Sequence, residues 1–192
     1  PQVAYRETIS RESEVHHVHK KQSGGPGQFA ELRLHLAPLE RGAGLRFESR
    51  IVGGAIPKEF IPAVDAGVRR AAQAGVLAGF PTSDFQATLL DGSFHERDSS
   101  TLAFELAAAA AFRDAAAKAG PTLLEPVMAV EVITPVEYLG DAIGDLHRRR
   151  GTVRNHTARG NAAVIEAQVP LKEMFGYIGN LRALSQGRAQ YS

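Results

Sequence analysis

The sequence predicts an α+β protein made of two consecutive units, and three features indicate this. Apolar and polar residues alternate in short segments over the first 52 residues, which is the period of half-buried strands. Residues 101–119 are rich in alanine, the residue with the highest helix propensity. The last part of the chain follows the order strand, helix, strand, strand, helix, strand, which is the split βαβ or ferredoxin-like order. We place the boundary at Gly120-Pro121, giving units over residues 1–120 and 121–192.

The first unit is predicted to begin with four strands, and the third is the clearest. In that strand Leu32, Leu34 and Leu36 share one face, because successive side chains of a strand point to opposite sides. The glycine-rich segment 23–28 is a dense turn signal, so the second and third strands are expected to form a hairpin with a flexible tip. The predicted strands cover residues 3–9, 15–22, 29–36 and 45–52.

A helix, a strand and a second helix are predicted to complete this unit. Pro57 is expected in the first helical turn, a position that proline favours, and Gly75 is expected to end the helix. A strand over residues 84–90 is followed by Asp91-Gly92, which predicts a turn. The polar loop after it ends in Ser99 and Ser100, whose hydroxyls can cap the helix over residues 101–119.

The second unit is predicted from the alternation of strand and helix patterns after Pro121. Helices are expected over residues 136–149 and 171–181. The predicted strands cover residues 127–133, 151–156, 163–169 and 188–191.

Composition limits the classes of function. The net charge is only +1, so any contact with nucleic acid must come from local basic patches. The chain has no cysteine, and it has no apolar run near the ~20 residues that span a bilayer. The first residues lack the features of a signal peptide and an initiator methionine. We therefore expect a cytoplasmic, monomeric protein without membrane contact, and a chain that is a piece of a longer protein.

Long strings of residues over essentially the whole chain resemble the C-terminal region of the elongation factor G family. They resemble its fourth and fifth domains, and the GTP-binding first domain, the second and the third have no counterpart here. The strings that carry the resemblance include residues 3–9, 23–29, 51–64, 90–100, 124–128, 134–146, 148–151, 159–162 and 170–177.

The resemblance implies a fold and a role. The first unit should have a fold like the second domain of ribosomal protein S5, with an unusual crossover, and the second unit should be ferredoxin-like. In the family the tip of the fourth domain enters the decoding site of the small subunit behind the moving tRNA, and the fifth domain lies at the factor-binding region of the large subunit. The expected partners are thus the ribosome, tRNA and mRNA. The chain would have no catalytic residue, cofactor or metal, because GTP and Mg²⁺ bind the missing GTPase domain of the parent.

The resemblance also assigns site residues by position. Glycines let a backbone approach phosphate closely, and His95 and Gln28 can donate hydrogen bonds that position RNA without reading its sequence. Pro26 stands where a basic or polar residue is common in the family. The residues expected to contact the ribosome or tRNA are Gly24, Gly25, Pro26, Gly27, Gln28, Ser93, His95, Asp98, Ser99 and Ser100.

A basic cluster in the second unit is the strongest candidate for binding rRNA phosphates. It follows a predicted helix, so its alternative interpretation is a solvated helix end whose cations compensate the helix dipole. The residues of the cluster are Arg148, Arg149, Arg150, Arg154 and Arg159.

Other motifs point to no further chemistry. A phosphate-binding Walker loop, a zincin helix and a Gly-x-Ser-x-Gly elbow are all missing from the sequence. His16, His17 and His19 are clustered, and on a strand His17 and His19 share a face and could bind a metal. No third ligand is identifiable, so an exposed strand whose charge responds near neutral pH is the simpler interpretation.

Three rival functions stay open at this point. A paralogue of the same family could serve ribosome recycling or ribosome protection. A small-molecule kinase could share the S5-like topology, but it needs its glycine- and serine-rich loop at a helix N-terminus, whereas residues 23–28 precede a predicted strand.

Overall fold

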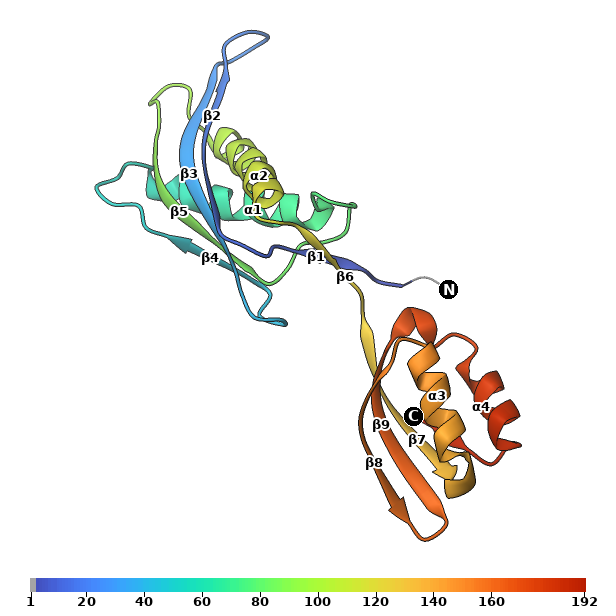
Figure 1. Ribbon diagram of the computed structural model, residues 1–192. Coiled ribbons are helices and arrows are strands. Elements are labelled where there is room, and N and C mark those ends of the chain that lie inside the picture. The colour runs from blue at the N-terminus through green and yellow to red at the C-terminus, as the bar shows by residue number, and fades with distance from the viewer. Residues whose placement is uncertain (1–2) are drawn as a thin grey trace. The chain divides into compact units, whose positions relative to one another are not determined.

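The computed structural model describes residues 3–192 and confirms the α+β class (Figure 1). The first two residues of the predicted first unit lie outside the described residues. Contacts between Cα atoms divide the chain into a unit over Tyr5–Leu124 and a second unit formed mainly by Glu125–Ser192. Each has a hydrophobic core of its own.

The first unit is built on a four-stranded sheet of order β2-β3-β5-β4. β5 is antiparallel to β3 and parallel to β4. Consequently the loops over residues 22–27, 50–57 and 94–100 all leave the same end of the sheet (Figure 1). The strands are β2 (Ser13–Lys21), β3 (Gln28–Pro38), β4 (Leu45–Ser49) and β5 (Phe85–Ser93).

Two helices, α1 (Ile61–Ala74) and α2 (Thr101–Lys118), cover one face of this sheet (Figure 1). The three leucines predicted on one face of β3 are fully buried there. Phe104 and Phe112 of α2 complete the core, and the alanines of the same helix allow close packing. This packed layer gives the loops at the end of the sheet a rigid base.

The start of the first unit differs from the prediction. The strand expected over residues 3–9 is only β1 (Arg6–Thr8), and it pairs with β6 (Thr122–Leu124) in a separate two-stranded sheet. The helix expected to begin around Pro57 begins at Ile61, because Pro57 is extended (ψ 140°) and precedes a short 3₁₀ helix, η1 (Lys58–Phe60). Pro62, not Pro57, occupies the first turn of α1.

The turn predicted at Asp91-Gly92 is wrong, since β5 continues to Ser93. Asp91 and Gly92 pair with Arg33 and Leu32 of β3, and the register shifts by one residue just before them. A Cβ atom at Gly92 would lie 2.3 Å from the carbonyl oxygen of Glu31. The glycine therefore permits a close approach of two strands and makes no turn.

The second unit has the predicted split βαβ arrangement, with sheet order β10-β7-β9-β8. β9 is antiparallel to both β7 and β8, so β7 and β8 are parallel with β9 between them. α3 (Leu139–Arg148) and α4 (Tyr177–Ser185) pack against this sheet. The strands are β7 (Val127–Pro135), β8 (Thr152–Arg159), β9 (Ala162–Pro170) and β10 (Gln190–Tyr191).

Short 3₁₀ helices precede both helices of the second unit, and they change the predicted limits. η2 (Val136–Tyr138) and η3 (Leu171–Glu173) each follow a proline that ends a strand. The helix predicted over residues 171–181 is thus a 3₁₀ turn, then Gly176 with a positive φ of 79°, and then α4. Between the two units, β6 follows Gly120 and pairs with β1, so the division by contacts falls after Leu124.

Candidate nucleic-acid interface

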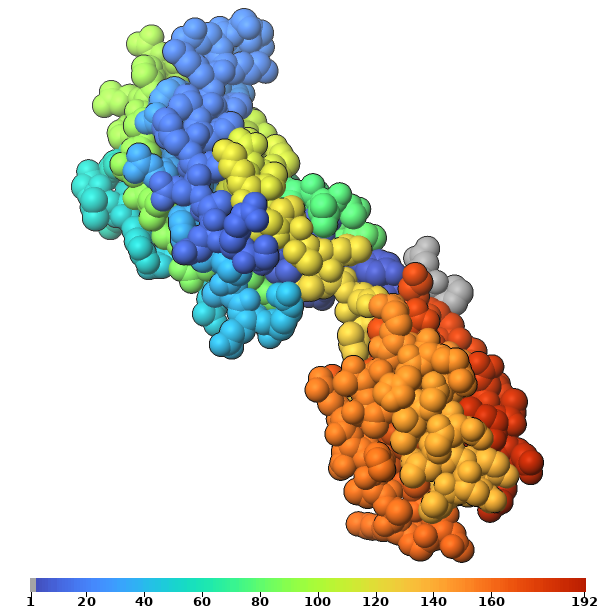
Figure 2. Space-filling view, in the orientation of Figure 1, coloured from blue at the N-terminus to red at the C-terminus, as the bar shows by residue number. Residues whose placement is uncertain are grey.

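Two of the loops at the end of the first unit are joined by hydrogen bonds. The N–H of Phe29, just after the glycine loop 22–27, donates to the carbonyl oxygen of Asp98 at 2.9 Å. The hydroxyl of Ser99 donates to the carbonyl oxygen of Phe29 at 2.7 Å. Figure 2 shows the two loops side by side at one end of this unit. They therefore form one projection, which we call the tip (residues 22–29 and 94–100).

Ser99 and Ser100 have different roles. The hydroxyl of Ser100 accepts the N–H of Ala103 at 3.0 Å and caps α2, as predicted. The predicted capping role of Ser99 is wrong. Its hydroxyl accepts the N–H of His95 at 2.9 Å while donating to Phe29, so it connects the two loops of the tip.

His95 is anchored on one side and open on the other. Its Nδ1 accepts the backbone N–H groups of Arg97 (3.3 Å) and Asp98 (3.2 Å). The side chain is 58% exposed. Within the described residues Nε2 makes no hydrogen bond, so this nitrogen can meet a ligand.

The glycine loop exposes its backbone. Gly24 and Gly25 have φ angles of +81° and +132°, and no atom lies within 4 Å of a Cβ built on either. Pro26 beside them is exposed. Gly27 differs, because a Cβ there would lie 2.8 Å from the carboxyl carbon of Asp98. The loop thus offers bare backbone at its apex and packs against Asp98 at its base.

Two of the predicted tip residues, Gln28 and Ser93, lie at the ends of β3 and β5 and are engaged in the sheet. Gln28 pairs its side-chain oxygen with Nε2 of His19 at 2.8 Å. The hydroxyl of Ser93 donates to Glu31 at 2.6 Å, and the other oxygen of Glu31 lies 3.0 Å from His16. These hydrogen bonds, from Ser93 first and then from His16, hold the pKa of Glu31 below its usual value. Gln28 and Ser93 therefore connect neighbouring strands where the sheet meets the tip loops.

The third loop at this end, over residues 50–57, was not predicted as part of the site. It carries Val52, which is 81% exposed, and Gly53 and Gly54, both with positive φ. The Gly53-Gly54 pair was the only local signal for it. Its position follows from the parallel pairing of β4 with β5, which joins residues about 40 apart in the chain.

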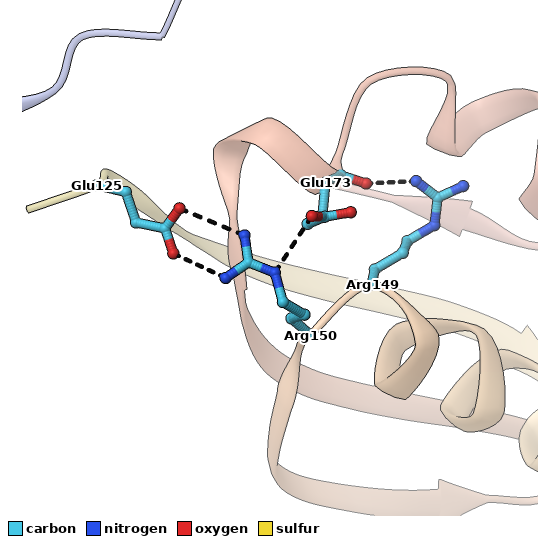
Figure 3. Close-up of polar contacts among 4 residues, drawn as sticks. All are labelled: Glu125, Arg149, Arg150 and Glu173. Carbon is cyan, nitrogen blue, oxygen red and sulfur yellow. Dashed lines mark hydrogen bonds and ion pairs between the residues drawn. The ribbon is translucent and has the colours of Figure 1, made fainter.

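Two of the five arginines predicted to bind rRNA are engaged within the protein (Figure 3). Arg149 is only 12% exposed, binds Asp145 at 3.1 Å and the carbonyl of Glu173, and stacks on Tyr177. Arg150 makes a bidentate contact with Glu125 at 3.0 and 3.3 Å and reaches Glu173 at 3.2 Å. These carboxylates, Glu125 first, raise the pKa of Arg150. Arg149 and Arg150 are thus held by contacts within the protein, and the predicted contact of these arginines with rRNA stays a prediction.

The other three arginines face solvent. Arg148 is 73% exposed and contacts Asp145 at 3.6 Å, and Arg154 binds the side-chain oxygen of Gln168 at 2.7 Å. Arg159 lines a hollow of about 500 Å³, and Arg188, which was not predicted as a site residue, lines it too. Arg188 pairs with Glu137 at 2.8 Å. We call this hollow the Arg159–Arg188 groove; its remaining lining is Ile133, Thr134, Pro135, Asn161, Ala162 and Gln190.

The histidine-rich strand shows no metal-binding arrangement in the part of the chain that the structure describes. His16 pairs with Glu31, and His19 pairs with Gln28. Burial lowers the pKa of His17, which is half-buried. Among residues 3–192, no helix is long and apolar enough to cross a membrane.

Comparison with known proteins identifies the family. Residues 1–120 match the family model for elongation factor G, domain IV, and residues 122–192 match the model for the elongation factor G C-terminus. The chain belongs to the elongation factor G family. This confirms the resemblance seen in the sequence, and the domain IV model accounts for the first unit with its tip.

Individual relatives agree with this assignment. The whole chain is 60% identical to elongation factor G of Orientia tsutsugamushi (strain Ikeda), 59% identical to elongation factor G 2 of Hahella chejuensis and 57% identical to elongation factor G of Granulibacter bethesdensis. It spans only 27–28% of the length of these relatives. A crystal structure of a Thermus thermophilus protein superposes over the whole chain with a TM-score of 0.90 and 43% identity, and the chain covers 29% of it.

Proposed function

We propose that this chain is the ribosome-binding part of a translational GTPase that promotes GTP-dependent translocation of tRNA and mRNA. The observation that carries the proposal is the tip, in which Ser99 and the Phe29–Asp98 hydrogen bond join two loops into one rigid projection. A rigid projection can act by binding one state of the ribosome more tightly than another, without bond chemistry.

The chemistry of the tip suits RNA of any sequence. Exposed glycine backbone at Gly24 and Gly25 can approach phosphates, and His95 presents a polar ring. Contacts of this kind position an RNA without reading its bases. A translocase must accept every codon, so a tip that recognises backbone and shape fits the decoding site.

The second unit would contact the large subunit through its exposed cations. Arg148 and the Arg159–Arg188 groove present guanidinium groups to solvent, and such groups bind phosphates. In this proposal GTP and Mg²⁺ bind a domain of the parent protein outside this chain, and the parent works in the cytoplasm, where it meets ribosomes.

Replacing His95 by alanine in the full-length parent tests the proposal. We expect single-round translocation, followed by the toeprint of mRNA position, to slow by about tenfold, as for the loss of one good hydrogen bond in the transition state. Ribosome-stimulated GTP hydrolysis should stay near the wild-type rate. An unchanged translocation rate would contradict the role of the tip.

The same assay separates the rivals. A wild-type parent that hydrolyses GTP on the ribosome but does not advance the mRNA by one codon would point to a paralogue for recycling or protection, with Pro26 as the first residue to examine. ATP binding by the chain would point to the kinase alternative. Its glycine loop precedes β3 and not a helix, which argues against that class.

A further inference from the structure

We propose that Arg150 is a positioning residue: by binding Glu125, it holds the segment that joins the two units and limits the freedom of the first unit, which carries the tip, relative to the second. The proposal rests on the proposed function, since a tip that acts as a rigid projection needs a defined attachment. It adds a residue of the other unit, whose role is a contact within the protein, to those on which translocation depends.

The connection between the two units runs through Leu124, Glu125 and Pro126. Leu124 is the last residue of β6 and pairs with Arg6 of β1 in the first unit. The carbonyl oxygen of Pro126 accepts the N–H of Leu171 in the second unit at 3.0 Å. Only Glu125 lies between these two anchored residues. The freedom of one unit relative to the other is therefore concentrated in the backbone around Glu125.

The end of the connection that belongs to the first unit is firmly held. In β1, the carboxylate of Glu7 accepts four backbone N–H groups of residues 76–80. The hydroxyl of Thr8 donates to the carbonyl oxygen of Ser83 at 2.8 Å. Every residue of β6 pairs with a residue of β1. Because movement of β6 would disturb these contacts, the chain bends most easily after β6 and not within it.

On the side of the second unit, Arg150 holds the side chain of Glu125 (Figure 3). Two guanidinium nitrogens contact the two carboxylate oxygens at 3.0 and 3.3 Å, and Nε contacts the carboxylate of Glu173 at 3.2 Å. A bidentate pair within a network has a defined geometry, unlike most exposed ion pairs. Pro126 also restricts Glu125 to extended conformations. The ion pair and the proline thus act on the one residue where the connection can bend.

The backbone of Arg150 indicates that its side chain has a task. Arg150 follows the C-cap of α3 and has a positive φ of 58°. The N–H groups of Arg150 and Gly151 donate to the carbonyl oxygens of His147 at 3.1 Å and Leu146 at 2.8 Å, which is the Schellman arrangement. Glycine is the usual residue at this position, because a side chain is unfavourable at positive φ. The contacts of the guanidinium with Glu125 and Glu173 give a reason for an arginine here.

Two substitutions test the ion pair and separate it from binding of RNA by the same arginine. Arg150→Gly removes the guanidinium and suits a backbone with positive φ, so we expect the second unit to unfold at the wild-type temperature or above it. A lower unfolding temperature would make Arg150 a stabilising residue and overturn the inference drawn from its backbone. Glu125→Gln weakens the same pair but leaves the arginine charged and free to meet RNA. Arg182→Ala is the control, because it removes an exposed arginine from α4 of the same unit.

The first measurement is the distance between two spin labels, one on each unit, by pulsed electron paramagnetic resonance of the 192-residue chain. The chain has no cysteine, so cysteines introduced at the exposed residues Gln73 and Asn180 are the only labelling sites. We expect a broader distribution of distances in Arg150→Gly and Glu125→Gln than in wild type, and no change in Arg182→Ala. Equal widths in all of these proteins would overturn the proposal.

The second measurement is single-round translocation by the full-length parent. We expect Arg150→Gly and Glu125→Gln each to slow translocation by about threefold, because a tip with more freedom is correctly placed for a smaller fraction of the time. Ribosome-stimulated GTP hydrolysis should stay near the wild-type rate. A loss in Arg150→Gly alone would mean that the arginine acts on rRNA, and a loss in Glu125→Gln alone would leave the arginine without a part in it. Either result would overturn the positioning role.

His95→Ala in the same assay keeps this proposal distinct from the proposed function. If His95→Ala slows translocation while Arg150→Gly and Glu125→Gln run at the wild-type rate, the tip keeps its function and only the positioning role fails. If His95→Ala also runs at the wild-type rate, the proposed function of the tip fails.

Discussion

Glu7 is a buried charged residue in the short strand β1. Its side chain is fully buried, and its two carboxylate oxygens accept four backbone N–H groups of residues 76–80 at 2.7 to 2.9 Å. The carboxylate thus supplies hydrogen-bond acceptors to the segment that connects α1 to β5, whose N–H groups would otherwise lack a partner. Burial alone would raise the pKa of Glu7, but the four hydrogen bonds outweigh it and lower the pKa.

Replacing Glu7 by glutamine keeps the shape and removes the charge. One of the two oxygens becomes an NH₂ group that faces N–H donors, so we expect the free energy of unfolding to fall by about 2–4 kcal/mol at pH 7. Urea denaturation of the chain measures this. A loss below about 0.5 kcal/mol would mean that water can satisfy the same N–H groups.

The lowered pKa of Glu7 also sets a pH dependence. A carboxylate whose pKa is lower in the folded state than in the unfolded state adds stability above the unfolded pKa, near 4.3, and loses it as the pH falls through the folded pKa. We expect the stability difference between wild type and Glu7→Gln to shrink as the pH falls from above the unfolded pKa to below the lower folded pKa of Glu7. A difference that is constant with pH would contradict the assignment.

Whether a side-chain hydrogen bond could be predicted from the sequence depends on how far away its partner lies along the chain. The cap at Ser100 was predictable, because its partner is three residues away. The partners of Glu7 and of Ser99 lie about 70 residues away, and only the fold brings them together. Likewise, nothing in the string Arg148-Arg149-Arg150 shows that Glu173 contacts Arg149 and that Glu125 contacts Arg150, because both glutamates come from other parts of the chain.

At the scale of elements, Gly67 shows how closely α1 and α2 pack. A Cβ at Gly67 would lie 2.3 Å from the carbonyl oxygen of Glu105 and 3.0 Å from the Cβ of Ala108. Gly144 in α3 has more space: the nearest atom to a Cβ built there is Nη1 of Arg148, at 4.0 Å. Both glycines are inside helices with negative φ, so alanine suits the backbone at both.

The same substitution should therefore have opposite effects at the two sites. Gly67→Ala is expected to destabilise the first unit by about 1–3 kcal/mol, because overpacking outweighs the gain in helix propensity. Gly144→Ala should stabilise the second unit by about 0.5–1 kcal/mol. Thermal unfolding of each variant, compared with wild type, measures both, and a stabilising effect of Gly67→Ala would show that the helices can move apart at no cost.

Helices and strands with a clear periodic pattern of apolar residues were predicted, but several of their ends were not. The leucine face of β3 and the alanine helix α2 follow from local pattern alone. The start of α2 was predicted, whereas the starts of α1, α3 and α4 were missed for one repeated reason. Pro57, Pro135 and Pro170 each adopt φ near −55° and ψ near 140° and are followed by a 3₁₀ turn, so proline here ends an extended segment and does not open a helix.

At the scale of the whole molecule, the order of elements carries much of the fold of the second unit. The order β-α-β-β-α-β predicted the sheet order β10-β7-β9-β8. The pairing of β1 with β6 had no such signal, because these strands lie more than 110 residues apart and are only three residues long. The S5-like fold of the first unit likewise came from the family resemblance and not from its pattern.

The charge distribution over the molecule leads to the last prediction. The net charge of +1 gives no general attraction to RNA, so the proposed contact of this chain with rRNA would depend on a few cations. Arg159 and Arg188 share one groove, and the ion pair of Arg188 with Glu137 is exposed, so removing both arginines should cost little stability. Loss of ribosome affinity would then report on lost contacts and not on unfolding.

In the full-length parent carrying Arg159→Ala and Arg188→Ala, we expect weaker binding and a flatter plot of log affinity against log salt, by roughly 0.7–0.9 per lost phosphate contact. Arg46→Ala with Arg69→Ala is the control, since it removes the same charge from the first unit. If the groove binds rRNA, only the groove variant changes the slope. Equal slopes in both variants and wild type would make the groove a solvated surface, whereas equal flattening in both would mean that the ribosome responds to net charge alone.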